Sequence, residues 1–196
     1  MDNTDKSLID AHCQGDRKAF AELVRRYGES VLGYLTKLSG SREQAEDLFQ
    51  ETFKHVHEKA HMLRGNRFKP WLFKIATNVA MDGLRRRSRP RVVSLNQELD
   101  CDDSDAKELG ATAIADDRHE PSQEAIRAEQ KQQVRQAIEL LPEKQRATLV
   151  LAYYQELSYR EVAQTMGCSI GTVKMQMYRA LKTLAQKLPD VSGGAK

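Results

Sequence analysis

One stretch of the chain has the spacing of a zinc-binding catalytic motif. It reads His57-Glu58-Lys59-Ala60-His61, which matches the H-E-x-x-H pattern in which two histidines on one helix hold zinc and the glutamate acts as a base. The match lies where a helix is expected to run into a loop, no third ligand is evident, and so short a pattern arises by chance. We therefore expect no metal site and no catalytic residue, and chelator-sensitive proteolysis would be the sign of the alternative.

A second stretch has the chemistry of a DNA-reading turn. Ser158 and Glu161 have the spacing of a capping box that starts a short helix, and Gly167 permits the positive φ of a tight turn. Ser169 can then cap a last helix, so the pattern is helix, short turn, helix. In this arrangement the second helix enters the major groove, where its first turns reach base edges. Any helix pair with a glycine corner fits the pattern too, but a cationic outer face favours DNA.

The last helix is expected to have one polar and one apolar face. Glutamine can pair bidentately with adenine, and lysine or arginine with guanine. The outward candidates are Thr172, Lys174, Met175, Gln176 and Arg179. The inward candidates are Ile170, Val173, Met177, Leu181, Leu184 and Leu188.

A polar stripe on an earlier helix runs into the most basic segment of the chain. Pro70 suits the first turn of this helix. Its apolar ribbon is Leu72, Ile75, Ala76, Val79, Gly83 and Leu84, and its opposite face carries Lys74, Asn78, Met81, Asp82 and Arg85. Residues 84–91 then hold five arginines in eight positions. The stripe could be a solvated face, but its continuation into the arginines favours a nucleic-acid surface.

Helical periodicity extends over nearly the whole chain, and no strand pattern is convincing. Asp16 can cap a helix that ends at Gly40, and Ser41 with Gln44 can start the next. The inner faces of these two helices are Phe20, Leu23, Val24, Tyr27, Val31, Leu35 and Leu38, and then Ala45, Leu48, Phe49, Thr52, Phe53 and Val56. Later, one helix stops at Leu141 and another opens at Pro142 with Ala147, Val150, Leu151 and Tyr154 inward.

Charge divides the chain into three parts. The 196 residues carry a net charge of only +3, yet residues 92–125 hold ten acidic residues against two basic ones. We expect an all-α protein with two small basic helical domains, 1–91 and 125–196, joined by a flexible acidic linker, 92–124. Basic domains suggest a polyanionic partner. No apolar run approaches the length of a membrane span, and three widely spaced cysteines suggest a reducing cytoplasm, so we expect no membrane insertion.

The motifs resemble those of bacterial sigma-70 class RNA polymerase sigma factors, specifically the small extracytoplasmic-function (ECF) group. Residues 47–53 (DLFQETF), 68–78 (FKPWLFKIATN) and 82–87 (DGLRRR) look like the family's region 2. Residues 140–146 (LLPEKQR) and the turn unit 157–179 look like its region 4. The resemblance covers about three-quarters of the chain. It implies a factor that binds core RNA polymerase, directs it to promoters and needs no cofactor.

The resemblance also implies a role for each matching residue. Asp47, Gln50 and Glu51 would bind core polymerase, formed by its beta and beta-prime subunits. The residues for the −10 element and strand opening would be Trp71, Lys74, Asn78, Asp82, Arg85 and Arg86. Those for the −35 element would be Ser169, Thr172, Lys174, Gln176 and Arg179. The linker would thread the polymerase cleft, and an anti-sigma factor is expected as a partner.

Three features depart from the family pattern. Gln176 stands where a cation is common, which puts the −35 base preference in doubt, Pro70 replaces a small polar residue, and the linker is long and acidic. A stand-alone helix-turn-helix repressor remains the other DNA-binding class, although it would need a dimer interface or ligand pocket that the sequence does not reveal. Co-elution with core polymerase separates the two, because a repressor binds a palindromic duplex without it.

Overall fold

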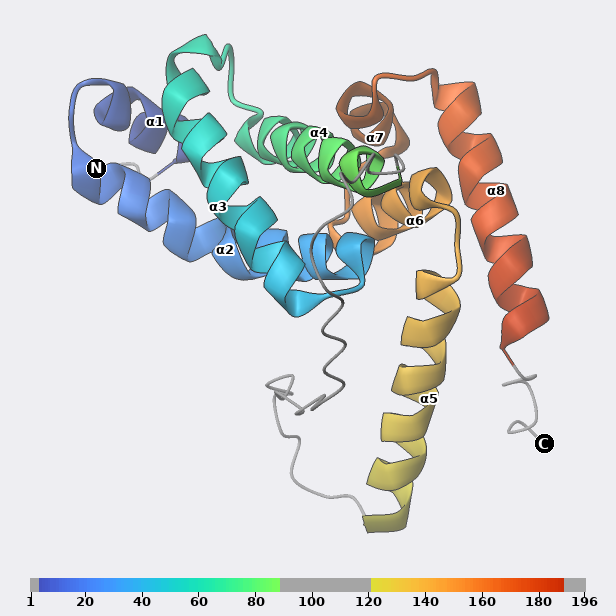
Figure 1. Cartoon of the computed structure of the whole chain (residues 1–196). Coiled ribbons are helices and arrows are strands. Elements are labelled where there is room, and N and C mark those ends of the chain that lie inside the picture. The colour runs from blue at the N-terminus through green and yellow to red at the C-terminus, as the bar shows by residue number, and fades with distance from the viewer. Residues whose placement is uncertain (1–3, 89–120, 189–196) are drawn as a thin grey trace, which may run out of the picture.

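The computed structural model describes residues 4–88 and 121–188, and every element within them is helical (Figure 1). The elements are α1 (Asp5–Cys13), α2 (Arg17–Ser39), α3 (Arg42–Lys59), the 3-10 turn η1 (Ala60–Met62), α4 (Phe68–Ser88), α5 (Pro121–Glu139), α6 (Glu143–Leu149), the π-type turn η2 (Val150–Tyr154), α7 (Tyr159–Met166) and α8 (Ile170–Lys187). The all-α prediction is confirmed. The expected linker lies outside the described residues, except that its last four positions already belong to α5.

Helix ends lie where the capping residues predicted them. The Asp16 carboxylate accepts a hydrogen bond from the Lys18 amide at 2.8 Å and starts α2. Gly40 ends that helix with φ of 75°, a left-handed conformation that glycine adopts without a Cβ clash. Ser41 then caps α3 by accepting from the Gln44 amide.

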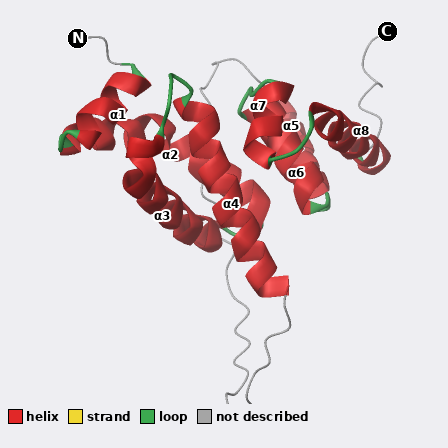
Figure 2. Cartoon of the chain, turned by 90° about the horizontal axis from the view of Figure 1, so that it is seen from above, coloured by secondary structure: helices red, strands yellow, loops and turns green. Residues whose placement is uncertain are grey.

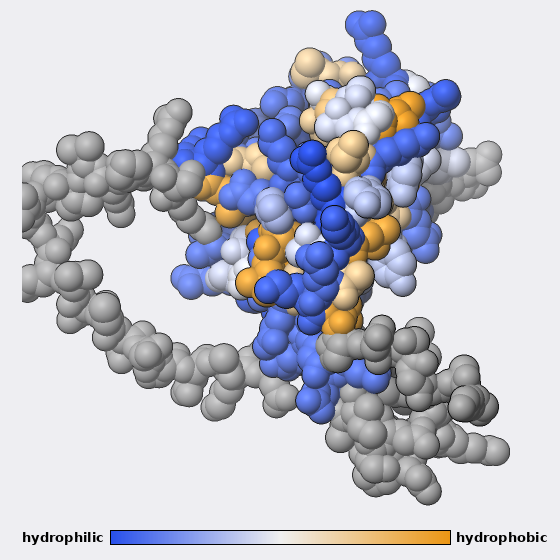
Figure 3. All heavy atoms as spheres, turned by 90° about the vertical axis from the view of Figure 1, so that its right-hand side faces the viewer, coloured by the Kyte–Doolittle hydropathy of each residue, from blue (hydrophilic) through white to orange (hydrophobic). Residues whose placement is uncertain are grey.

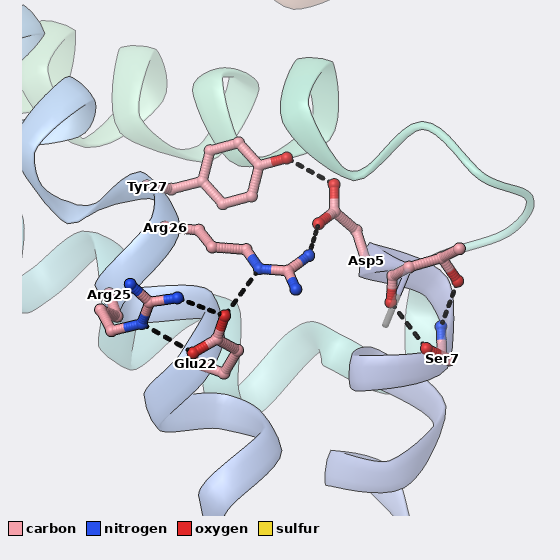
Figure 4. Close-up of polar contacts among 7 residues, drawn as sticks. Asp5, Ser7, Glu22, Arg25, Arg26 and Tyr27 are labelled. Atoms are coloured by element: carbon pink, nitrogen blue, oxygen red, sulfur yellow. Dashed lines mark hydrogen bonds and ion pairs between the residues drawn. The ribbon is translucent and has the colours of Figure 1, made fainter. Parts of the chain in front are cut away.

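The sequence analysis missed α1, a short helix that polar contacts hold on α2 (Figure 4). The Asp5 carboxylate accepts a hydrogen bond from the Tyr27 hydroxyl and a second, at 3.3 Å, from the Arg26 guanidinium. Arg26 also donates to Glu22 at 2.9 Å, so one guanidinium links the two helices. Nine residues form an isolated helix poorly in water, so these contacts and the burial of Ile9 supply its stability.

The first module, α1 to α4, packs around the predicted inner faces of α2 and α3. A buried hydrogen bond crosses its core at 2.7 Å between the Tyr34 hydroxyl and Thr77. The one-sided ribbon predicted for α4 was incomplete, because Phe73, Thr77 and Ala80 are buried as well. Figure 2 shows why: α4 lies between α3 on one side and the second module, α5 to α8, on the other.

The second module differs from the sequence prediction at three apolar positions. Ile170 and Leu181 are 41% and 52% exposed, because α8 contacts α6 and α7 through a narrower stripe centred on Val173 and Ala180. Tyr154 is 41% exposed instead of inward. The π-type turn adds a residue to the helical turn before it, which rotates Tyr154 outward and leaves the following side chain, Gln155, buried.

Candidate nucleic-acid interface

The turn before α8 is built as the sequence predicted. Ser158 accepts a hydrogen bond from the Glu161 amide at 3.3 Å while its own amide donates to the Glu161 carboxylate at 2.9 Å. The Ser158 hydroxyl also donates to the Glu161 carboxylate at 2.7 Å, and this bond, followed by the bond from the Ser158 amide, holds the pKa of the Glu161 carboxyl below its usual value. Gly167 ends α7 with φ of 64°, and Ser169 starts α8 by accepting from the Thr172 amide at 3.0 Å. The capping-box, turn and cap predictions are all confirmed, and they fix the direction in which α8 leaves the turn.

Helix α8 presents a cationic outer surface. Ile170–Lys187 contains no acidic residue. Its basic side chains, Lys174, Arg179, Lys182 and Lys187, are exposed and form no ion pair with a described residue. Figure 3 views the molecule from the side on which α8 lies and shows a largely hydrophilic surface with small apolar patches. This face suits a polyanion, because unpaired cations are free to neutralise phosphates.

The predicted −35 residues are not equivalent in the structure. Lys174 and Arg179 are exposed, whereas Gln176 is half-buried on the flank of α8. The hydroxyls of Ser169 and Thr172 lie 2.9 Å apart and hydrogen-bond to each other at the helix start. Met175, which the sequence analysis placed on the outward face, is 50% exposed. Tyr178 and Lys182 are also exposed but were not predicted, although their spacing of three to four residues from Met175 was the signal that could have found them.

A second polar surface follows α4. The predicted side chains Lys74, Asn78, Asp82, Arg85 and Arg86 are all exposed. Asp82 and Arg85 lie 3.7 Å apart as an i,i+3 pair, so the carboxylate offsets part of the positive charge there.

Trp71 differs from the rest of the α4 set because it is only half exposed. Its ring packs against Phe68, with 6.0 Å between centroids. It also lines a cavity of about 360 Å³ together with Arg64, Arg67 and Lys74, whose far wall is α7. Arg64 and Arg67 were absent from the predicted site residues, because in the sequence they belong to a loop with no helical period.

A third surface, on α3, is acidic. Asp47, Gln50 and Glu51 are exposed there, on the side of the helix away from its buried Leu48–Thr52 stripe. Asp47 and Gln50 make no side-chain hydrogen bond with another described residue, and Glu51 lies 3.8 Å from the His55 ring. An exposed acidic face is unsuited to phosphate and suits a protein partner.

The histidine motif does not assemble as a ligand set. Helix α3 ends at Lys59, so His61 belongs to η1, while the His57 ring lies 3.1 Å from the His12 ring. Over residues 4–88 and 121–188, no three His, Cys, Asp or Glu side chains come close enough to share a metal ion. In the same residues, no helix combines the length with the apolarity that a bilayer span requires.

Two family models match the chain. "Sigma-70 region 2" matches residues 23–90, which include most of α2 and the whole of α3 and α4. "Sigma-70, region 4" matches residues 131–184, which include the capped turn and most of α8. The three surfaces described above, with the exception of Lys187 at the end of α8, therefore lie within the two matched regions.

Individual relatives are similar over most of their length. The chain is 32% identical over 186 residues to the ECF RNA polymerase sigma-E factor of Haemophilus influenzae, covering 94% of this chain and 95% of the relative. It is 33% identical over 175 residues to the ECF RNA polymerase sigma factor RpoE of Cereibacter sphaeroides, with 88% of each chain covered. Among solved structures, the sigma factor RpoE in complex with the anti-sigma factor NepR from Bartonella quintana aligns with a TM-score of 0.64 at 25% identity, covering 86% of this chain and 96% of that one.

Proposed function

The chain belongs to the ECF group of the sigma-70 family of RNA polymerase sigma factors, and from this membership we propose that it joins core RNA polymerase and directs it to specific promoters. Helix α3 binds the polymerase, α4 binds the −10 element and assists strand opening, and α8 binds the −35 element. The observation that carries the proposal is the position of two surfaces suited to nucleic acid, one inside each family region. The cytoplasm, where polymerase works, is the expected location.

The −35 role rests on α8. Its acid-free sequence and its accessible Lys174 and Arg179 suit a helix that lies in the major groove. The hydroxyls of Ser169 and Thr172 hold the helix start, where free amide groups favour a phosphate. Gln176 reaches the duplex only along one flank, so Met175 and Tyr178 contribute apolar contacts such as those made to thymine methyl groups.

The −10 role rests on α4. Its exposed Lys74, Asn78 and Arg86 follow one another toward the arginine-rich segment. Opening a duplex requires unstacked bases to find new partners, and an aromatic ring stabilises a stacked base by about 1–3 kcal/mol. Trp71, half exposed at the edge of a cationic cavity, is placed to accept such a base.

Polymerase supplies what this chain lacks when it acts alone. Each module offers a short surface, so each binds DNA weakly by itself. A partner that holds both modules at a set separation makes the second contact intramolecular, and the two contacts then reinforce each other. An anti-sigma factor is a further expected partner, supported by the similarity to RpoE bound to NepR.

The test of the polymerase contact is a charge reversal at Asp47. Asp47→Arg places a cation in the acidic face of α3, and we expect it to abolish co-elution with core polymerase while the helical content is unchanged. The control is Glu46→Arg, the same change at an exposed neighbour that lies about 100° around the helix. The control should co-elute like the parent protein.

Promoter-specific transcription completes the test. With core polymerase, the parent chain should give defined transcripts from genomic fragments, and Asp47→Arg should give none. Unchanged co-elution of Asp47→Arg would refute the assignment of α3. Tight binding of the free chain to a palindromic duplex, with no effect of polymerase, would replace the whole proposal with a repressor.

A further inference from the structure

Two histidines from different helices face each other where the end of α1 meets the end of α3. The His12 Nε2 atom and the His57 Nδ1 atom lie 3.1 Å apart, although the two residues are 45 positions apart in the chain. His12 lies outside the residues that the region 2 family model matches, whereas His57 lies inside them. The family match therefore does not cover this pair.

Aromatic packing holds both imidazole rings in place. The His12 ring stacks on Phe20, with 4.6 Å between the centroids and 29° between the planes. The Phe20 ring also meets His57 and Phe53 edge-on, with centroid distances of 5.5 and 6.3 Å. One aromatic side chain of α2 thus positions a histidine of α1 and a histidine of α3, so the two nitrogens need little rearrangement to act together.

The geometry of the two rings suits a shared metal ion. If the rings met end to end, their centroids would be separated by the 3.1 Å between the nitrogens and by one ring radius on each side. The centroids are only 4.9 Å apart and the planes are inclined by 50°, so the rings are bent relative to each other, as two ligands of one ion are. An ion at about 2.0–2.1 Å from each nitrogen would have an angle of about 95–102° between the two bonds. This angle lies between the octahedral and the tetrahedral value, so either geometry accepts the pair.

Each ring has one nitrogen that can reach such an ion. Nδ1 of His12 is buried, so Nε2 is the nitrogen that this ring can offer. His57 is exposed, and water can therefore complete the coordination of an ion held by two protein ligands. Imidazole is mostly neutral above about pH 7, and it suits Zn²⁺, Cu²⁺ and Ni²⁺.

We propose that His12 and His57 form a two-histidine site for a divalent transition-metal ion, with water in the remaining coordination positions. The ion binds Nε2 of His12 and Nδ1 of His57. Both nitrogens must then act as electron-pair donors, so the proton between them passes to the other nitrogen of its own ring. The site differs from the H-E-x-x-H spacing because it uses His12 in place of His61, and it does not depend on the function proposed above.

A bound ion fastens the C-terminal end of α1. Asp5 already holds the other end of this helix through its contacts to Tyr27 and Arg26. The two nitrogens are held together in the folded chain, so the second metal bond is intramolecular and the pair binds more tightly than either ring alone. An ion that binds the folded chain in preference to the unfolded chain raises its stability.

Titration calorimetry of the full chain with Cu²⁺, Ni²⁺ and Zn²⁺ tests the site. Cys13, Cys101 and Cys168 are replaced by serine in every sample, because thiolates bind the same ions and Cys13 adjoins His12. The chain should bind each of these ions, Cu²⁺ most tightly, and should not bind Mg²⁺, which prefers oxygen ligands. The same ions should raise Tm by an amount that grows with their concentration.

Two variants each remove one ligand. His12→Phe keeps an aromatic ring against Phe20 without a nitrogen, and His57→Gln removes the ligand at an exposed position. Each should weaken Cu²⁺ binding by at least about tenfold, since even the residues that orient metal ligands contribute this much to affinity. Each should also lose the rise in Tm. Circular dichroism checks that the helices form, and His57→Gln decides the question if His12→Phe disturbs the packing of α1.

Two further histidine variants serve as matched controls. The His55 ring lies 3.2 Å from the Glu58 carboxylate on the same helix, so His55→Gln makes the same change beside the proposed site. His61→Gln removes the second histidine of the H-E-x-x-H spacing. Both variants should bind Cu²⁺ like the parent chain.

The outcomes are exclusive. A parent chain that binds none of the three ions would overturn the proposal, and the 3.1 Å contact would then be a hydrogen bond between two neutral rings. Equal binding by the parent, His12→Phe and His57→Gln would overturn it as well. Binding that is lost in His61→Gln but kept in His12→Phe would assign the ion to the H-E-x-x-H spacing instead.

Discussion

Arg146→Ala is the substitution whose effect on stability can be worked out most fully from the structure. The guanidinium is half-buried, and its burial holds the pKa of Arg146 below the usual value. It joins the C-terminal carbonyls of α2 to those of α5. Truncation to alanine leaves these carbonyls without their donor and leaves a gap between the two helix ends.

The magnitude follows from the hydrogen bonds that are lost. A bond from a charged donor contributes about 1.5–3 kcal/mol, and the bonds to Leu38 and Leu141, at 2.9 and 3.0 Å, have good lengths. Water can replace part of this, because the side chain is only half-buried. We therefore expect Arg146→Ala to lower the free energy of unfolding by about 2–4 kcal/mol, which corresponds to about 4–16 °C in Tm for a chain of this length.

Urea and thermal unfolding followed by circular dichroism measure this loss. Arg146→Lys keeps the charge but replaces the planar guanidinium with a compact ammonium, which can donate to the carbonyls of only one helix end. This variant should therefore lose about half as much free energy of unfolding as Arg146→Ala. The control is Arg135→Ala, which removes an exposed ion pair to Glu139 and should cost at most about 0.5 kcal/mol. The reasoning fails if Arg146→Ala is no more destabilising than Arg135→Ala, or if Arg146→Lys unfolds like the parent protein.

Three further results are expected. Tyr34→Phe removes the buried bond to Thr77 and should lower the free energy of unfolding by about 1 kcal/mol in urea, since the Thr77 hydroxyl keeps its bond to a backbone carbonyl. Burial, and then the neighbouring imidazole of His57, lowers the pKa of His12 below its usual value of 6.5. The unfolded chain therefore binds more protons than the folded one, and the free energy of unfolding should fall as the pH drops below 6.5. His12→Gln should weaken this pH dependence in urea titrations from about pH 7.5 to about pH 5.5. Lys174→Ala and Arg179→Ala should each reduce transcription from promoters with a −35 element, and equal output with and without the element would contradict the role of α8.

The ends of the helices were predictable because a helix cap or a tight turn depends on the type of a single residue. Asp16, Gly40, Ser158 and Gly167 end or start helices in the structure as their side chains or their lack of one require. A cap depends on the few backbone atoms beside it, so no knowledge of the tertiary fold is needed. The same holds for the exposure of the polar side chains on the α4 stripe, which follows from period, whereas Met81, predicted on that stripe, is partly buried against the core.

The burial of side chains was predicted less well wherever it depends on packing against another helix or against the other module. Phe73 lies off the predicted ribbon of α4, and only the presence of several packed neighbours buries it. Thr165 and Gln155 are polar and belong to no inner face that the sequence predicted, yet both are buried where the second module packs on the first. Conversely, Leu181 was expected to be inside and is exposed, since hydrophobicity alone does not say how wide a contact is. The sequence carries no pattern that specifies contact between two separate domains.

Helix α4 carries part of the candidate site and also packs against α7 of the second module, and this affects how its substitutions must be interpreted. Its Trp71 end lines the cavity against α7, whereas its Arg86 end lies beyond the residues that line that cavity. A change at Trp71 is therefore expected to alter both base stacking and the packing of α7 on α4, while a change at Arg86 alters the DNA surface alone. Effects on transcription at Trp71 can be assigned to DNA only after urea unfolding shows that the stability of the chain is unchanged. The two ends of one helix thus separate promoter binding from the packing between the two modules.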